Sequence, residues 1–203
     1  MARVSQAQAQ ENRRRVVDTA SRLFREQGTG VSVADLMKAA GLTHGAFYKQ
    51  FASKEALVDE ATAHAFDDLA RRHTAGLDQY GGQRDAAQRA LIDAYLSTEH
   101  RDDAADGCPV AGLATDVARE PEDREARRVY AEGVASFAAF LAPDGATEAG
   151  AEDAARDGLT RLSTLVGALI LARATQGSPL SEEILAAAHA ALTECAGRGS
   201  GRC

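Results

Sequence analysis

The segment VSVADLMKAAGLTHGAFYKQF, residues 31–51, contains two short helical patterns separated by a glycine. Ser32 is a natural N-cap for the first pattern, which we expect over Val33–Ala40. Thr43 caps the second pattern, which we expect over His44–Phe51. Two short helices joined by a tight turn that contains glycine have the spacing of a helix-turn-helix, whose second helix enters the major groove of DNA.

A longer amphipathic helix precedes this segment, from about Gln8 to Gln27. Its apolar residues recur at steps of three and four, and they are Val16, Ala20, Leu23 and Phe24. A helical pair as short as the one in residues 31–51 needs such a face to pack against. The arginines Arg13–Arg15 lie on the other face, where a solvated flank and a contact with phosphate remain equally open interpretations.

Helical patterns continue along the chain, and no segment of the sequence shows the sustained alternation typical of strands. We expect further helices from Ser53 onward, over Arg84–Glu99, from Cys108 to Pro121, and over Glu122–Leu141, Ala154–Thr175 and Ser181–Cys195. The chain is therefore predicted to be all-α with about nine helices. A three-helix DNA-binding domain is expected over residues 1–55, followed by a helical domain over residues 56–203.

Charge is unevenly distributed, although the formal net charge of the 203 residues is −7. Residues 1–55 hold nine Lys/Arg against five Asp/Glu, a net +4, so the remaining 148 residues carry −11. A basic N-terminal part followed by an acidic remainder allows one end of the protein to bind phosphates. The longest apolar stretch, Leu165–Ala172, is far shorter than the ~20 residues that cross a bilayer, and the N-terminus lacks the apolar core of a secretory signal. We expect a cytoplasmic protein without a membrane partner.

The segments around the helix-turn-helix resemble the signature of the TetR/AcrR family of transcriptional regulators. The resemblance lies, in order, in FREQG (24–28), VSVADL (31–36), AAGLTHGAFYKQF (39–51) and SKEAL (53–57). Gln50 is a departure, because many members have an aromatic residue there. The resemblance implies a homodimeric repressor that binds a pseudo-palindromic operator in double-stranded DNA and releases it when a small-molecule effector binds.

The resemblance also assigns residues to DNA. The predicted DNA-binding residues are Ser32, Thr43, His44, Gly45, Tyr48, Lys49 and Lys54. Thr43, Tyr48 and Lys54 are expected at phosphates, because hydroxyl and ammonium groups bind phosphate oxygens. His44, Gly45 and Lys49 are expected to read bases or to approach them closely.

The helices between Ala61 and Leu141 are expected to enclose the effector pocket. Its candidate lining residues are Phe66, Tyr95, Cys108, Leu113, Phe137 and Phe140, and core packing is the competing interpretation for each of them. The last two helices should meet those of a second copy in a four-helix interface, because apolar residues occupy more than one of their faces. The predicted interface residues are Leu162, Val166, Leu169, Ile170, Ile184, Ala188 and Leu192.

The three cysteines, at positions 108, 195 and 203, show no spacing typical of a zinc site or a disulfide framework, and we predict neither metal nor cofactor. Cys108 begins an expected helix, a position that can lower a thiol pKa, so an electrophile or redox sensor is an alternative function. The nearby Asp102, Asp103 and Asp106 favour a neutral, structural thiol instead. A thiol enzyme that pairs Cys108 with His100 lacks an orienting third group, and we do not expect an enzyme.

Overall fold

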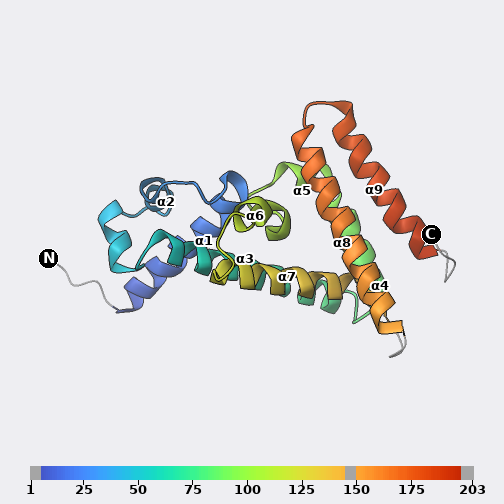
Figure 1. Ribbon diagram of the computed structural model, residues 1–203, viewed down its shortest axis with the longest axis horizontal. Helices are drawn as coiled ribbons and strands as arrows, with labels where there is room; N and C mark the ends of the chain where they lie inside the picture. Colours follow the sequence, from blue (N-terminus) through green and yellow to red (C-terminus); the bar gives the residue numbers. More distant parts are fainter. Residues whose placement is uncertain (1–5, 145–149, 198–203) are drawn as a thin grey trace. The chain divides into compact units, whose positions relative to one another are not determined.

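The computed structural model describes residues 6–144 and 150–197, and all regular secondary structure within them is helical (Figure 1). The elements are α1 (Gln6–Gln27), α2 (Val33–Ala39), the 3-10 helix η1 (His44–Lys49), α3 (Lys54–Gln79), α4 (Arg84–Tyr95), α5 (Thr98–Asp102), α6 (Pro109–Val117), α7 (Glu125–Leu141), α8 (Ala151–Ala174) and α9 (Pro179–Gly197). The all-α prediction is confirmed, and the described residues form nine α-helices and one 3-10 helix, one helix more than the expected nine.

One predicted helix is interrupted. The pattern over Arg84–Glu99 predicts a single helix, but α4 ends at Tyr95 and Ser97 starts α5. The Ser97 hydroxyl accepts a hydrogen bond at 3.1 Å from the backbone N–H of His100, a donor that a new helix start leaves open. Capping by this serine therefore outweighs the helical periodicity around it.

The helices form two compact units, each made of two segments of the chain. The first unit comprises the residues up to Leu69 together with Ala104–Ala131, and the second comprises Ala70–Asp103 with the residues from Glu132 onward. Both α3 and α7 contribute residues to both units. These two units are defined by how compactly their residues pack. The boundary predicted between residues 55 and 56 instead separates a DNA-binding domain from an effector-binding domain, so it stays a prediction.

The first unit is built around side chains from α1, α2, η1, α3, α6 and α7. Its buried cluster contains Val16, Ala20, Phe24, Leu36, Met37, Ala40, Phe47, Phe51, Leu57, Val58, Ala61, Leu113, Val117 and Ala126. The predicted apolar face of α1 lies in this core, with Leu23 partly buried at its edge. One continuous core therefore holds the two short helices against α1 and extends to α6.

Helix α6 is fixed to the C-terminal end of α1. A Cβ at Gly112 would lie 3.1 Å from the backbone of Arg25, so the close approach of the two helices depends on this glycine. The Asp116 carboxylate accepts a hydrogen bond from the N–H of Thr29 at 2.9 Å, and Arg25 donates to the carbonyl of Ala105 at 2.7 Å. The first contact holds the loop that follows α1, and the second holds the segment that precedes α6.

In the second unit, α8 and α9 lie side by side and are joined by a short turn (Figure 1). Leu165 and Leu169 of α8 and Leu185 of α9 are buried in this pair. Helix α8 also approaches α7 closely, because a Cβ at Gly158 would overlap the carbonyl oxygen of Ala138. Glycine is therefore required at this crossing.

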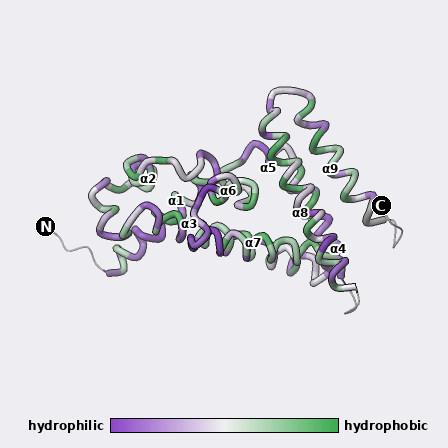
Figure 2. The backbone as a smooth tube through the Cα atoms, in the orientation of Figure 1, coloured by the Kyte–Doolittle hydropathy of each residue, from purple (hydrophilic) through white to green (hydrophobic). Residues whose placement is uncertain are grey.

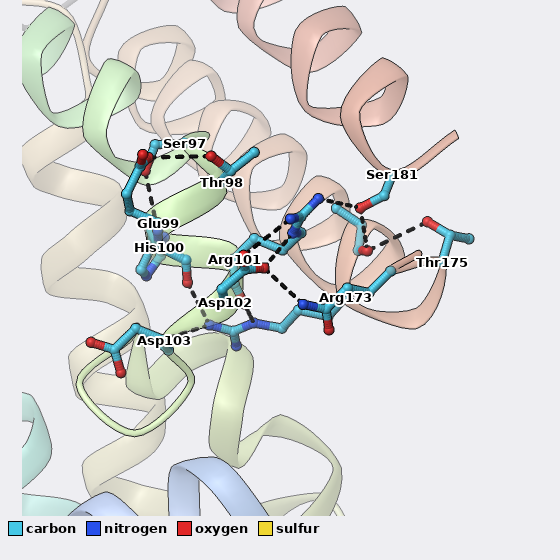
Figure 3. A network of polar contacts seen from close by, with 12 residues as sticks. Ser97, Thr98, Glu99, His100, Arg101, Asp102, Asp103, Arg173, Thr175 and Ser181 are labelled. Atoms are coloured by element: carbon cyan, nitrogen blue, oxygen red, sulfur yellow. Dashed lines mark hydrogen bonds and ion pairs between the residues drawn. The ribbon is translucent and has the colours of Figure 1, made fainter. Parts of the chain in front are cut away.

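A polar network connects α5 with α8 and α9 (Figure 3). Arg173 of α8 donates to the carbonyl of Arg101 at 2.9 Å and to that of His100 at 3.0 Å, which satisfies carbonyl groups at the end of α5. Arg101 donates to the Ser181 hydroxyl at 2.9 Å, and this hydroxyl donates to the carbonyl of Ala172 at 2.7 Å. The five-residue α5 is thus held mainly by tertiary hydrogen bonds.

No helix in the part of the chain that the structure describes has both the length and the apolar content needed to cross a bilayer. Figure 2 shows that hydrophobic and hydrophilic residues alternate along the helices instead of forming one long apolar run. This pattern is typical of amphipathic helices that bury one face against their neighbours.

Candidate nucleic-acid interface

The first short helix begins where the sequence predicts it. Ser32 has extended backbone angles, and its hydroxyl accepts a hydrogen bond from the N–H of Asp35 at 3.1 Å. The same hydroxyl donates to the Asp35 carboxylate at 2.6 Å. The carboxylate also lies near the positive end of the helix dipole, where negative charge is stabilising. Ser32 therefore starts α2 while its side chain stays on the surface.

The turn between α2 and η1 depends on a glycine. Gly41 has a φ of +70°, a conformation that glycine adopts without the steric cost of a Cβ. Its N–H donates to the carbonyl of Lys38 at 3.0 Å, and the N–H of Leu42 donates to that of Met37 at 2.8 Å. These bonds satisfy the last carbonyl groups of α2 and confirm the predicted tight turn.

The second helix is shorter and tighter than predicted. The sequence pattern indicates an α-helix over His44–Phe51, whereas η1 is a 3-10 helix over His44–Lys49 with Gln50 as its C-cap. A six-residue segment that contains Gly45 has little helical stability of its own, so tertiary packing decides its geometry. The element exists at the predicted place, and its pitch is the part that sequence reasoning missed.

Two phenylalanines attach η1 to the core. Phe47 is 1% exposed, and its ring stacks on that of Phe51 with 5.4 Å between the centroids. The next residue, Tyr48, is 67% exposed, with its ring at 5.8 Å from the ring of His44. Because Phe47 is fixed in the core, Tyr48 and Lys49, which follow it in the tight helix, are directed to solvent.

All predicted DNA-binding residues are accessible. Ser32, Thr43, His44, Gly45, Tyr48 and Lys49 are exposed, and Lys54 is partly exposed. Thr43 is the N-cap residue of η1 as predicted, but its hydroxyl makes no capping hydrogen bond, which leaves it available to a partner. A Cβ at Gly45 would meet no described atom within 4 Å, so packing within the chain does not require a glycine there. Contacts of these residues with DNA stay predictions.

Lys54 is held at the start of α3, where Ser53 provides the predicted cap. The Ser53 hydroxyl accepts a hydrogen bond from the N–H of Ala56 at 3.1 Å. Hydrogen bonds from its own backbone N–H and from the Ser53 hydroxyl hold the pKa of Glu55 below its ordinary value. Lys54 therefore projects from a well-defined helix start rather than from a loose loop.

Arg13 has a structural role, which is neither of the two interpretations that the sequence left open for it. Its guanidinium group lies 4.4 Å from the ring centroid of Phe51, donates to the carbonyl of Gln50 and pairs with the carboxylate of Glu60. It therefore connects α1 with the end of η1 and with α3. The two arginines that follow it make hydrogen bonds within α1.

The predicted effector residues are divided between the two units. Phe66, Cys108 and Leu113 belong to the first unit, and Tyr95, Phe137 and Phe140 belong to the second. In the second unit the rings of Tyr95 and Phe137 lie 6.2 Å apart, and His73 lies 4.5 Å from the rings of Phe137 and of Phe140. We refer to Tyr95, Phe137, Phe140 and His73 as the aromatic cluster. Sequence reasoning overlooked His73.

His73 is buried, and its Nε2 atom has no hydrogen-bond partner among the described residues. Burial lowers the pKa of His73 to about 4, and the positive charge of Arg72 acts in the same direction. The imidazole is therefore neutral at neutral pH. A buried polar atom without a partner is costly unless another group satisfies it.

An open cavity of about 320 Å³ also lies in the second unit. It is lined by Leu96, Thr98, Glu182, Leu185, Ala186 and His189, which include none of the predicted effector residues. At its edge His189 pairs with the Asp93 carboxylate at 2.6 Å.

The predicted dimer residues form a buried group and an accessible group. Leu162, Leu169, Ala188 and Leu192 are buried within the single chain. Ile170 is 42% exposed, and Val166 and Ile184 are partly exposed. Val166 and Ile170 share one face of α8 with the exposed Leu159, and Ile184 lies one turn from the exposed Leu180 on α9. The apolar surface that stays exposed on these two helices is therefore formed in part by the accessible group, Val166, Ile170 and Ile184.

Cys108 is the N-cap residue of α6 and is 3% exposed. Nearby, the Tyr130 hydroxyl donates to the carbonyl of Val110 at 2.7 Å. Burial raises the pKa of Tyr130 to about 12, and negative charge on Cys108 acts in the same direction. A thiol this buried meets electrophiles poorly, which favours the structural role. Cys203 and the side chain of Cys195 lie outside the described part of the chain.

Comparisons with known proteins agree with this arrangement. Residues 16–61 match the family described as bacterial regulatory proteins, tetR family. Residues 85–190, slightly more than half of the chain, match the C-terminal domain of LmrA/YxaF-like transcriptional regulators. The chain belongs to the TetR/AcrR family of transcriptional regulators.

Relatives of this TetR-family regulator share parts of its sequence. The HTH-type transcriptional regulator AcrR of Shigella flexneri is 44% identical over 61 residues, which cover 30% of this chain and 28% of AcrR. The HTH-type transcriptional repressor KstR2 of Rhodococcus jostii (strain RHA1) is 33% identical over 93 residues, which cover 43% of this chain and 41% of KstR2. The chain therefore spans less than half the length of these relatives.

The reduced form of E. coli NemR has the same fold, with a TM-score of 0.71 and 22% identity over 90% of this chain and 96% of that chain. This likeness shows the fold, and the two family models indicate a transcriptional regulator.

Proposed function

We propose that this TetR-family regulator is a homodimeric repressor that binds a pseudo-palindromic operator and releases it when a small molecule binds. The observation that carries the proposal is the segment Thr43–Lys49, which is anchored by the buried Phe47 and exposes Thr43, His44, Gly45, Tyr48 and Lys49. A short helix anchored on one side and open on the other suits insertion into the major groove. The cytoplasm, where bacterial DNA lies, is the expected location, and the similar KstR2 is described as a repressor.

The proposed contacts divide into phosphate and base contacts. Thr43, Tyr48 and Lys54 present a free hydroxyl, an exposed phenol and an ammonium group, which bind phosphate oxygens without reading sequence. His44 and Lys49 present polar groups that can hydrogen-bond to base edges. The open space around the glycine at position 45 allows the backbone to approach the groove.

A titration of the purified protein against the DNA that flanks its own gene tests this assignment. Lys54→Met is expected to weaken binding to cognate and random duplexes alike and to reduce the slope of log affinity against log salt by about 0.9. His44→Ala is expected to weaken cognate binding about 5- to 100-fold with little effect on random duplex. Arg156→Met, an exposed charge on α8, is the control that leaves both affinities unchanged. Equal losses on both duplexes for His44→Ala refute its reading role.

Release by an effector is proposed to act through the aromatic cluster. A neutral imidazole with an unsatisfied Nε2, packed against two phenylalanine rings, suits a flat and largely apolar molecule that bears one hydrogen-bonding group. An effector that prefers one of two conformers lowers DNA affinity by its differential binding energy, about 1–3 kcal/mol. Helix α3 contributes Lys54 and His73 to different units, so it is the element proposed to transmit the change.

The test of this step is a DNA-release assay against a panel of aromatic compounds. His73→Phe keeps the ring packing and removes the Nε2 atom. We expect the variant to bind DNA normally and to need at least about tenfold more of an active compound for release, a loss typical of one missing buried hydrogen bond. Equal sensitivity of the wild type and His73→Phe to every active compound contradicts the proposed pocket.

A further inference from the structure

Three side chains that are metal ligands in many proteins converge in the first unit, between α1 and α3. The Nε2 atom of His64 lies 3.4 Å from a carboxylate oxygen of Asp18 and 3.4 Å from a carboxylate oxygen of Asp68. One potential ligand atom from each residue lies within 4.8 Å of the others. His64 and Asp68 are one helical turn apart on α3, and Asp18 comes from α1.

One hydrogen bond from the imidazole does not account for both of its contacts. Nε2 carries at most one proton, yet it faces two carboxylate oxygens at the same distance. Both distances exceed the approximately 2.7–2.9 Å of a charge-assisted hydrogen bond. The imidazole therefore sits between two acceptors without a close bond to either of them.

The spacing agrees with a coordination polyhedron. Zinc binds imidazole nitrogen and carboxylate oxygen at about 2.0–2.2 Å, so neighbouring ligand atoms of a tetrahedral site lie about 3.3–3.6 Å apart. The two distances of 3.4 Å from the His64 nitrogen lie in that range, and the two carboxylate oxygens lie within 4.8 Å of each other. Carboxylate oxygens and a neutral imidazole nitrogen are ligands that zinc accepts. We propose that Asp18, His64 and Asp68 form a site for a divalent transition-metal ion of the zinc type.

The surroundings allow an ion to enter and remain hydrated. The side chain of Asp18 is more than half exposed, and those of His64 and Asp68 are partly exposed. Three protein ligands leave a fourth position for water. The sequence prediction of no metal rested on cysteine spacing, and it missed this group because Asp18 and His64 are 46 residues apart.

The ion would reinforce an existing contact between α1 and α3. Arg13 pairs with Glu60 between the same two helices. Asp18 follows Arg13 along α1, and His64 follows Glu60 by one turn along α3. The contact between Asp18 and His64 is therefore a further contact along the same pair of helices. Because α1 also packs on the helix-turn-helix, the ion would stabilise the helices against which the helix-turn-helix packs.

Isothermal titration of the tag-free, chelator-treated full chain with zinc chloride tests the proposal without DNA, so its outcome is independent of the proposed function. We expect one equivalent of zinc to bind and to raise Tm. His64→Gln and Asp68→Asn should each weaken binding at least about tenfold, a loss typical of damage to a metal site. Asp67→Asn and His189→Gln are matched controls outside the cluster and should bind zinc as the wild type does.

Cobalt(II) provides a second readout, because intense visible absorption reports tetrahedral coordination. The wild type and both controls should develop the absorption, and His64→Gln and Asp68→Asn should not. Far-UV circular dichroism verifies that the variants fold, so that lost binding is assigned to lost ligands. Absence of zinc binding by the wild type, or equal binding by all five proteins, overturns the proposal.

Discussion

At the scale of single residues, His73 is the side chain whose surroundings change its acid–base behaviour most. Burial lowers its pKa to about 4 from the ordinary value of 6.5, which the unfolded chain retains. Between these values the unfolded chain binds the proton more tightly than the folded chain does. The contribution of His73 to the free energy of unfolding is therefore fully present above about pH 6.5. It is lost as the pH falls toward 4, which lowers the free energy of unfolding by roughly 3 kcal/mol across that window.

His73→Phe is predicted to reduce this pH dependence. The free energy of unfolding, measured in urea at about pH 7.5 and about pH 5, should fall less with acidification in the variant than in the wild type. Burial also lowers the pKa of His100, so part of the dependence should remain. Identical slopes in the two proteins would contradict the role assigned to His73.

Residues that act locally could be predicted from the sequence, and residues that connect distant segments could not. The caps at Ser32 and Ser53 follow from the local pattern of a helix start. Arg13 instead meets Gln50 and Glu60, 37 and 47 residues away, and no local pattern indicates such contacts. His73 escaped notice for the same reason, since its neighbouring rings come from α7.

At the scale of elements, the predictions succeed where strong breakers bound a periodic pattern. Helix α1 ends at Gln27 as predicted, because a glycine with positive φ follows. The errors arise in short elements. The 3-10 geometry of η1 depends on a single core contact, and the separate helix α5 depends on a single cap. A pattern of apolar residues in the sequence reveals neither of these features.

The crossing of α7 and α8 provides a stability prediction. Gly158→Ala places a methyl group against the carbonyl of Ala138 and is expected to destabilise the fold by about 1–3 kcal/mol, or more if the helices must separate. Gly76→Ala is the matched control, because a methyl carbon added at this helical position of α3 would meet no described atom within 4 Å. The control should be neutral or stabilising by up to about 1 kcal/mol. Thermal unfolding of both variants measures the difference, and equal Tm values would refute it.

The end of α5 provides a second prediction at this scale. Arg173→Lys keeps the charge but cannot reproduce two donors in fixed directions toward the carbonyls of Arg101 and His100. We expect a loss of about 1–3 kcal/mol in urea unfolding, the cost of leaving carbonyl groups unsatisfied. Arg156→Lys, in an exposed pair on α8, should change stability by less than about 0.5 kcal/mol. Similar small effects of both variants would show that the network contributes little.

At the scale of the whole molecule, the partition of apolar residues on α8 and α9 limits how two copies can meet. Leu162 and Leu169 are 3% and 0% exposed, so they stabilise the single chain and have little surface left for a partner. Their place on a helix with excess apolar residues could be predicted from the sequence. Which apolar face of α8 packs inside the single chain could not, because apolar residues lie on more than one face of that helix. The face that stays open contains Leu159, Val166 and Ile170.

Ile170→Glu is therefore predicted to disrupt the proposed dimer and leave the fold intact. Ile170 is 42% exposed in the single chain, so a charge there is solvated in a monomer but buried without a counter-charge in a dimer. Sedimentation velocity should show a monomer at concentrations where the wild type is dimeric, and operator affinity should fall because the two half-sites are no longer bound together. Tyr80→Glu changes an exposed aromatic residue outside α8 and should remain dimeric. A dimeric Ile170→Glu protein with wild-type operator affinity would place the interface on another surface.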